Sequence, residues 1–188
     1  RSQACGVRIR GIELSGRWTP AEAVEAEKIL KTLPPRWVEE NKDFRMLVRE
    51  PVLRNAPANA PGHSKYIPVL SAIVVYYKGV YDGQRIDPEQ FRLSIFHELA
   101  HTIVRQSPRL LSAWTATTSG AGFVDDYAKT SPEEDFADTF SEYLISRDAT
   151  RKAVPPKAEF IRCMLEQSSE QQEKVAMNFM RGFTDELV

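Results

Sequence analysis

The stretch DPEQFRLSIFHELAHTIVRQSP (residues 87–108) decides the fold prediction, because it encodes a helix with clear limits and an unusual pair of histidines. The segment DPEQ (87–90) has the pattern of a capping box with proline at the first helical position, and Pro108 ends the helix at about Gln106. Apolar residues on one face of this helix are expected in the core: Leu93, Phe96, Ala100 and Ile103.

The motif HELAH (97–101) contains two of the chain's three histidines. His97 and His101 are one helical turn apart, so their imidazoles project together, as two ligands of one metal ion require. Glu98 is rotated by about 100° around the helix, where a carboxylate can take a proton from a metal-bound water molecule. The alternative interpretation is an amphipathic helix with two partly exposed histidines and a glutamate in a salt bridge.

A catalytic zinc ion also needs a third protein ligand and an open fourth position. His63, the remaining histidine, lies before the motif in a loop rich in proline and alanine. The extended motif HExxHxxGxxH is absent, because Val104 stands in place of its glycine and no histidine follows in 105–108. These observations favour a carboxylate from a later helix as the third ligand.

A later helix, 131–146, begins with the cap-and-proline sequence SPEE. Glu134 and Asp138 are one turn apart on it, so Glu134 can bind zinc while Asp138 orients a ligating histidine through its other ring nitrogen. Two alternatives stay open at this point. Glu134 completes the capping box that Ser131 begins, or Glu133 provides the ligand or the acidic first turn instead.

The rest of the chain shows strand patterns only in its first half. Strands are predicted at 7–14 and 44–50, and a strand or a bent pair of strands at 67–77. Helices are predicted at 19–32, 87–106, 131–146, 156–167 and 169–185, and irregular structure at 54–66 and 107–130. Strands and helices followed by helices alone are typical of the α+β class. We therefore predict a single domain, 1–188, with an N-terminal α/β part of about 1–106 and a helical C-terminal part of about 107–188.

The composition is that of an ordinary globular protein, with 42% hydrophobic residues, 27% charged residues and a net charge of −1. This balance gives no indication of a nucleic-acid partner, and no apolar run approaches the ~20 residues of a membrane-spanning helix. We expect a monomer. Because the sequence starts without methionine, we expect a processed form. The two cysteines, Cys5 and Cys163, would form a disulfide in an exported protein or stay two thiols in a cytosolic one.

HELAH followed by YAKTSPEEDFADTF (127–140) resembles the anthrax-lethal-factor-like zinc metallopeptidases, which include the secreted Pro-Pro endopeptidases of Gram-positive bacteria. Those proteins carry HExxH and then a tyrosine seven residues before a glutamate ligand. Here Tyr127 precedes Glu134 by seven residues, and the pattern P-E-E-x-F-A-[DE] is intact at 132–138. The resemblance is specific over 97–101 and 127–144.

The resemblance implies a zincin-like fold and a secreted zinc-dependent endopeptidase with one catalytic zinc ion. It implies roles for five residues: His97, His101 and Glu134 as zinc ligands, Glu98 as general base and Tyr127 as the group that stabilises the oxyanion. The alternative for Tyr127 is a loop tyrosine packed on the core. Two positions depart from the family pattern, since Asp135 stands where phenylalanine is frequent and Asp138 is one methylene shorter than the usual glutamate.

The expected partner is a protein or peptide substrate, bound in extended form along the edge of the sheet beside residues 71–77. Proline specificity is not carried over, because the substrate-shaping loop of the Pro-Pro enzymes cannot be aligned here. Two other interpretations stay open: an intracellular HExxH peptidase of the type that cleaves phage repressors, and a peptidase-like binding module without turnover. Trp114 is expected to be an ordinary packing residue.

Overall fold

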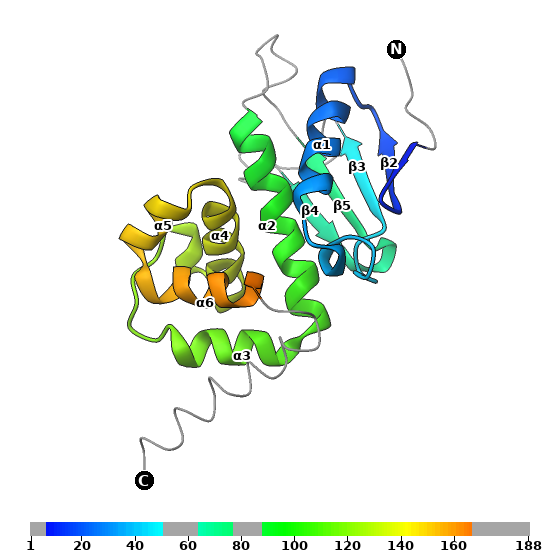
Figure 1. Ribbon diagram of the computed structural model, residues 1–188. Helices are drawn as coiled ribbons and strands as arrows, with labels where there is room; N and C mark the ends of the chain where they lie inside the picture. Colours follow the sequence, from blue (N-terminus) through cyan, green and yellow to red (C-terminus); the bar gives the residue numbers. More distant parts are fainter. Residues whose placement is uncertain (1–6, 51–63, 77–87, 167–188) are drawn as a thin grey trace. The chain divides into compact units, whose positions relative to one another are not determined.

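The structure of the chain is a computed structural model that describes residues 7–50, 64–76 and 88–166 (Figure 1). The chain divides into two compact units, Arg1–Ile103 and Val104–Val188, and the division falls inside the last turn of one helix. The first unit contains all described strands, and the second is helical. The predicted α+β class with a helical C-terminal half is confirmed; a single domain spanning 1–188 stays a prediction.

The first unit is built on a mixed sheet of five described strands in the order β1-β2-β3-β5-β4. Its strands are β1 (Val7–Ile9), β2 (Ile12–Gly16), β3 (Met46–Glu50), β4 (Ser64–Ile67) and β5 (Ala72–Tyr76). The predicted strand at 7–14 is a hairpin, because Arg10 and Gly11 both have positive φ, 51° and 82°, as a tight two-residue turn requires. β2, β3 and β5 are parallel, whereas β4 is antiparallel to β5.

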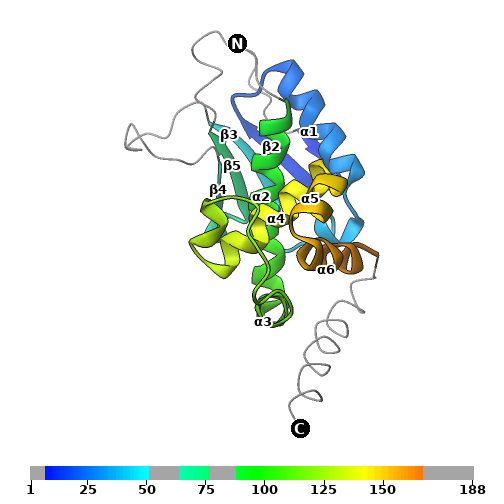
Figure 2. The ribbon, with the colours of Figure 1, turned by 90° about the vertical axis from the view of Figure 1, so that its left-hand side faces the viewer.

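Helix α1 (Pro20–Thr32) connects β2 to β3 as the sequence predicts. Both halves of its capping box form: the Thr19 hydroxyl accepts a hydrogen bond from the Glu22 N–H, and the Glu22 carboxylate accepts one from the Thr19 N–H. α1 and α2 (Pro88–Gln106) lie side by side on one face of the sheet (Figures 1 and 2), and an Arg92–Glu25 ion pair joins them. A short 3-10 turn, η1 (Pro35–Trp37), follows α1.

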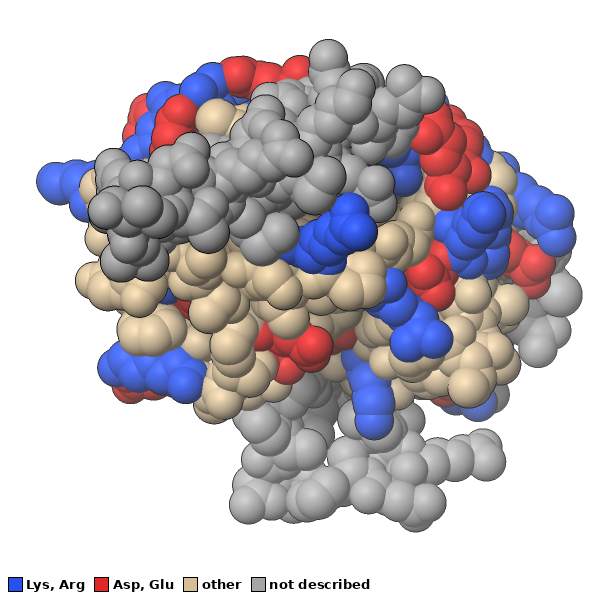
Figure 3. Space-filling view, turned by 90° about the horizontal axis from the view of Figure 1, so that it is seen from below, with Lys and Arg blue, Asp and Glu red and all other residues tan. Residues whose placement is uncertain are grey.

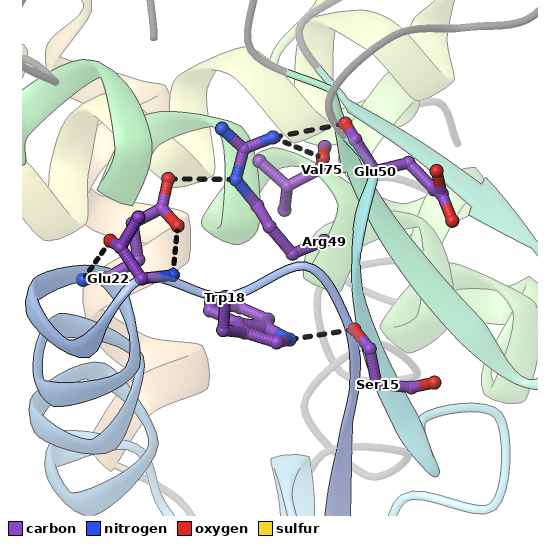
Figure 4. Close-up of polar contacts among 7 residues, drawn as sticks. Ser15, Trp18, Glu22, Arg49, Glu50 and Val75 are labelled. Carbon is purple, nitrogen blue, oxygen red and sulfur yellow. Dashed lines mark hydrogen bonds and ion pairs between the residues drawn. The ribbon is translucent and has the colours of Figure 1, made fainter. Parts of the chain in front are cut away.

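A buried ion pair fixes α1 to the sheet (Figure 4). Arg49 on β3 donates to the Glu22 carboxylate at 2.9 Å, and both side chains are almost fully buried. The same guanidinium donates to the backbone carbonyls of Glu50 and Val75. Because every charged group in this network has partners, its burial is tolerated inside the core.

The second unit packs four described helices and a 3-10 turn. They are α3 (Pro108–Thr117), η4 (Tyr127–Lys129), α4 (Pro132–Ile145), α5 (Arg147–Ala153) and α6 (Pro155–Glu166). Trp114 of α3 is fully buried and lies edge-on to Phe136 and Phe160, so the prediction that it is a packing residue is confirmed. Its indole N–H donates to Asp135 at 3.0 Å.

Asp135 also accepts a hydrogen bond from Lys157 at 2.6 Å. Both side chains are buried, and the Lys157 ammonium lies 4.2 Å from the centroid of the Phe123 ring. A carboxylate in this apolar position is stable because a lysine from α6 and an indole from α3 both donate to it. Lys157 therefore balances the buried charge of Asp135.

The structure corrects three expectations about local structure. The last three residues of the predicted loop at 54–66 belong to strand β4, where Ser64 and Tyr66 alternate with Lys65. A 3-10 turn, η2 (Pro68–Leu70), separates β4 from β5. The predicted irregular segment 107–130 contains helix α3, because Pro108 occupies the first turn of a new helix, where proline is tolerated. Helix α5 was not expected, because its sequence RDATRKA has no apolar periodicity.

The other predicted helices agree closely where the structure describes them. The helix expected at 131–146 is α4, and the helix expected at 156–167 is α6. The predicted helix at 169–185, His63 and the predicted cap Asp87 lie outside the described residues.

The described surface has mixed charge. On the face seen in Figure 3, lysine and arginine side chains alternate with aspartate and glutamate, and the described residues form no broad patch of one sign there. In the described part of the chain, no helix is both long enough and apolar enough to cross a membrane.

Candidate metal centre

Helix α2 is anchored along most of its length, and this anchoring fixes the direction of its histidines. Of the residues predicted to face the core, three are buried and Leu93 is half-buried; the buried ones are Phe96, Ala100 and Ile103. The apolar face is wider than predicted, because it also contains the fully buried Phe91, Ile95 and Leu99. Beside His101, the hydroxyl of the buried Thr102 accepts a hydrogen bond from the Asn41 side chain at 2.8 Å. The helix therefore cannot rotate without breaking core contacts.

His97 and His101 turn their Nε2 atoms toward each other, as the spacing predicts. The two nitrogens are 3.1 Å apart, and the ring planes are inclined by 75°. Two imidazole nitrogens bound to one tetrahedral zinc ion at about 2.0–2.1 Å would lie about 3.3 Å apart. The observed separation is thus close to the one that a shared zinc ion requires.

Glu134 on α4 completes a group of three possible metal ligands. One ligand atom from each of His97, His101 and Glu134 lies within 4.8 Å of the other two. The backbone N–H of Glu134 donates to the Ser131 hydroxyl at 3.1 Å, so this residue takes part in the helix cap through its backbone. The capping role and a ligand role of its side chain are therefore compatible. Glu133, the alternative ligand, is exposed and does not belong to the group.

Two imidazole nitrogens and one carboxylate oxygen are a donor set that suits zinc. This set leaves the fourth position of a tetrahedral ion without a protein ligand, as a catalytic site requires. The residues present therefore fit the metal that the sequence motif implies.

Glu98 is buried, with 7% of its surface exposed, and strand β4 holds its carboxylate. The Ser64 hydroxyl donates to Oε1 at 2.9 Å, and the Tyr66 backbone N–H donates to Oε2 at 2.6 Å. Both oxygens of the Glu98 carboxylate therefore have a hydrogen-bond donor on β4.

Tyr76, at the end of β5, is influenced by the same carboxylate. Burial of its phenol raises its pKa, and the negative charges of Glu98 and Glu50 raise it further. Tyr76 is therefore a neutral phenol at physiological pH.

Tyr127 and Asp138 both belong to the second unit. Tyr127 begins the turn η4, which packs against α4, and 47% of its surface is exposed. Both interpretations of Tyr127, as an oxyanion donor and as a loop tyrosine packed on the core, stay open. Asp138 is half-buried on α4, one turn after Glu134. The roles predicted for both side chains stay predictions.

The sheet topology corrects the expected place of an extended substrate. β5 pairs with β3 on one side and with β4 on the other, so residues 72–76 have no free edge. Among the described strands, the edges are β1 and β4. An added strand near Glu98 would therefore have to lie beside β4.

Sequence reasoning missed Ser64 and Tyr66 as partners of Glu98. Their segment was interpreted as loop because of the prolines and asparagines at 54–63. The available signal was the alternation of residues 64–67, a short run with period two that ends at Pro68.

Comparison with known proteins finds a similar fold. A structure of the Pro-Pro endopeptidase (PPEP-2) from Paenibacillus alvei matches with a TM-score of 0.52 and 17% sequence identity, over 82% of this chain and 97% of that chain. No protein-family model and no curated protein matches the sequence. At 17% identity the similarity shows a shared fold alone, and membership in the lethal-factor-like family stays a prediction.

Proposed function

We propose that this protein is a zinc-dependent endopeptidase that cleaves a protein or peptide substrate with Glu98 as general base. The observation that carries the proposal is the group of possible ligand atoms from His97, His101 and Glu134, next in sequence to a buried, hydrogen-bonded glutamate. The fold shared with a Pro-Pro endopeptidase is consistent with peptidase activity.

His97, His101 and Glu134 would hold one zinc ion. When bound, zinc would supply the Lewis acidity for peptide hydrolysis, by polarising the scissile carbonyl and lowering the pKa of a water molecule toward about 7. The two histidines must be neutral to bind it, so acid would release the metal. Asp138 would orient one of the histidines by accepting a hydrogen bond from its other ring nitrogen.

Glu98 would take the proton from the attacking water molecule and deliver it to the nitrogen of the leaving amine. Such general acid–base catalysis contributes about 10²–10⁴-fold to the rate. The carboxylate accepts two hydrogen bonds from β4, and it has about four acceptor positions, so it can also accept one from water.

Tyr127 would donate a hydrogen bond to the oxyanion that forms at the scissile carbonyl. Its half-exposed position allows contact with a substrate that approaches from solvent. The substrate would bind in extended form beside β4, which is an edge strand among the described strands.

The decisive experiment is cleavage of a combinatorial peptide library by wild type, Glu98→Ala, Glu134→Ala and Glu133→Ala, each with measured zinc content. We expect wild type and Glu133→Ala to bind zinc and cleave, Glu98→Ala to bind zinc without cleaving, and Glu134→Ala to bind zinc at least tenfold more weakly. Zinc in wild type without cleavage would favour a binding module. Absence of zinc from every variant at saturating zinc concentration would refute the proposal.

We also propose that the protein is secreted, with cytoplasmic action as the alternative. Cys163 is half-buried on α6, and Cys5 lies outside the described residues. For a secreted form we expect a Cys5–Cys163 disulfide, so an alkylating reagent should add no mass under non-reducing conditions and two equivalents after reduction. Two equivalents without reduction would favour the cytoplasmic alternative.

A further inference from the structure

Strand β4 directs one backbone donor away from the sheet and toward Glu98. Tyr66 lies opposite Ile73 in the antiparallel pair with β5, yet its N–H donates to the Glu98 carboxylate. In an antiparallel ladder, the residues of alternate pairs point their N–H and C=O groups outward. Tyr66 and Ser64 are such outward-pointing residues, and Lys65 between them faces β5 with its backbone.

The Ser64 hydroxyl adds a second donor, and its single proton has two possible acceptors. The hydroxyl lies 2.9 Å from Glu98 Oε1 and 3.1 Å from the Ser94 carbonyl oxygen. Ser94 is within α2, where a carbonyl already accepts the helical hydrogen bond from the residue four positions later. A carboxylate is also the stronger acceptor, so the proton of Ser64 is directed to Glu98.

These two donors control a torsion that helix packing leaves free. The last torsion of a glutamate side chain has a broad energy profile, so burial of the stem does not fix the plane of the carboxylate. In this structure one oxygen is bound by Ser64 and the other by Tyr66, so the plane is set by β4. The donors come from a segment 34 and 32 residues earlier in the chain.

We infer that Ser64 is a positioning residue for Glu98: its hydroxyl holds the carboxylate in the plane in which it can reach the attacking water molecule. The inference rests on the proposed function, because it gives Glu98 the part of a general base. Since Tyr66 contributes through its backbone, Ser64 is the side chain of β4 through which this contact can be changed by substitution.

The test compares Ser64→Ala, Ser64→Thr and the control Lys31→Ala, which replaces an exposed lysine on α1. A misplaced catalytic group costs up to about 10²-fold, so we expect Ser64→Ala to lower kcat about 10- to 100-fold, with KM and zinc content close to wild type. Ser64→Thr keeps the hydroxyl on a β-branched side chain that suits a strand, and it should restore kcat to within about threefold of wild type. Lys31→Ala should leave kcat unchanged.

A second readout does not depend on activity. Amide hydrogen exchange at Tyr66 should be slow in wild type, faster in Ser64→Ala and fastest in Glu98→Ala, because the N–H loses a fixed acceptor step by step. Equal exchange in wild type and Glu98→Ala would overturn the inference, and so would an unchanged kcat in Ser64→Ala when Glu98→Ala is inactive. A wild type without peptidase activity would instead show that the proposed function has failed, and the inference with it.

Discussion

Replacing Lys157 by methionine would remove the cation from the buried ion pair of the second unit. Lys157 donates to Asp135 at 2.6 Å, and the side chains of the two residues are 1% and 8% exposed. Methionine has a similar length and fills the same space without the charge. The carboxylate of Asp135 would then stay buried with the Trp114 indole as its described donor.

The expected cost follows from this burial. Leaving one partner of a buried ion pair unpaired costs about 3–5 kcal/mol. The remaining hydrogen bond from Trp114 offsets part of this cost, so we expect the lower end of the range, about 3 kcal/mol. For a protein of 188 residues, 1 kcal/mol shifts Tm by about 2–4 °C, and the expected decrease is therefore about 6–12 °C.

The measurement is thermal unfolding followed by circular dichroism at fixed protein and saturating zinc concentrations, because bound metal also changes Tm. Lys152→Met is the matched control, since Lys152 is an exposed lysine on the neighbouring helix α5 and its replacement should shift Tm by less than about 2 °C. The double variant Asp135→Asn/Lys157→Met removes both charges and keeps an oxygen for the Trp114 N–H. It should recover more than half of the loss.

Two results would refute this reasoning. A Tm of Lys157→Met within about 2 °C of wild type would show that the ion pair is not a buried, energetically coupled contact. A double variant that loses the sum of the two single effects would show that Asp135 and Lys157 do not interact.

Two further predictions concern the backbone and an exposed ion pair. Gly16→Ala should destabilise the protein more than Gly11→Ala in urea denaturation. Both glycines have positive φ, which alone costs an alanine about 1–2 kcal/mol. A Cβ at Gly16 would also lie 2.3 Å from a backbone oxygen, whereas a Cβ at Gly11 would have no other atom within 4 Å. The hydrogen bond from Arg162 lowers the pKa of Glu159 from 4.5 to about 2. The small contribution of this hydrogen bond to stability is therefore present above pH 4.5 and lost as the pH falls toward 2. Arg162→Gln should return the pKa of Glu159, measured by NMR titration, toward 4.5.

The sequence by itself predicted where α1, α2 and α4 begin, and it predicted the local part of the candidate site. Prolines and capping residues mark where α1, α2 and α4 begin, and these signals act within one turn of the chain. The convergence of His97 and His101 follows from the same short range, because residues four apart on a helix always share a face.

The choice between neighbouring carboxylates needed the tertiary structure. Glu133 and Glu134 have the same chemistry and adjacent positions, and both are compatible with the cap of α4. Burial and the ligand distances separate them, since Glu133 is exposed and Glu134 belongs to the ligand group. A sequence pattern cannot make this distinction, because it depends on which face of α4 is covered.

The tertiary structure alone decided the contacts between distant segments. The β4 donors to Glu98 lie in a stretch that was interpreted as loop, and the partner of Asp135 is Lys157, 22 residues later on another helix. Periodicity and capping report interactions over three or four residues, whereas these contacts form only when separate elements pack together. The sequence therefore predicted the candidate ligands and the candidate base Glu98, and only the packing of β4 against α2 gave the Glu98 carboxylate its donors.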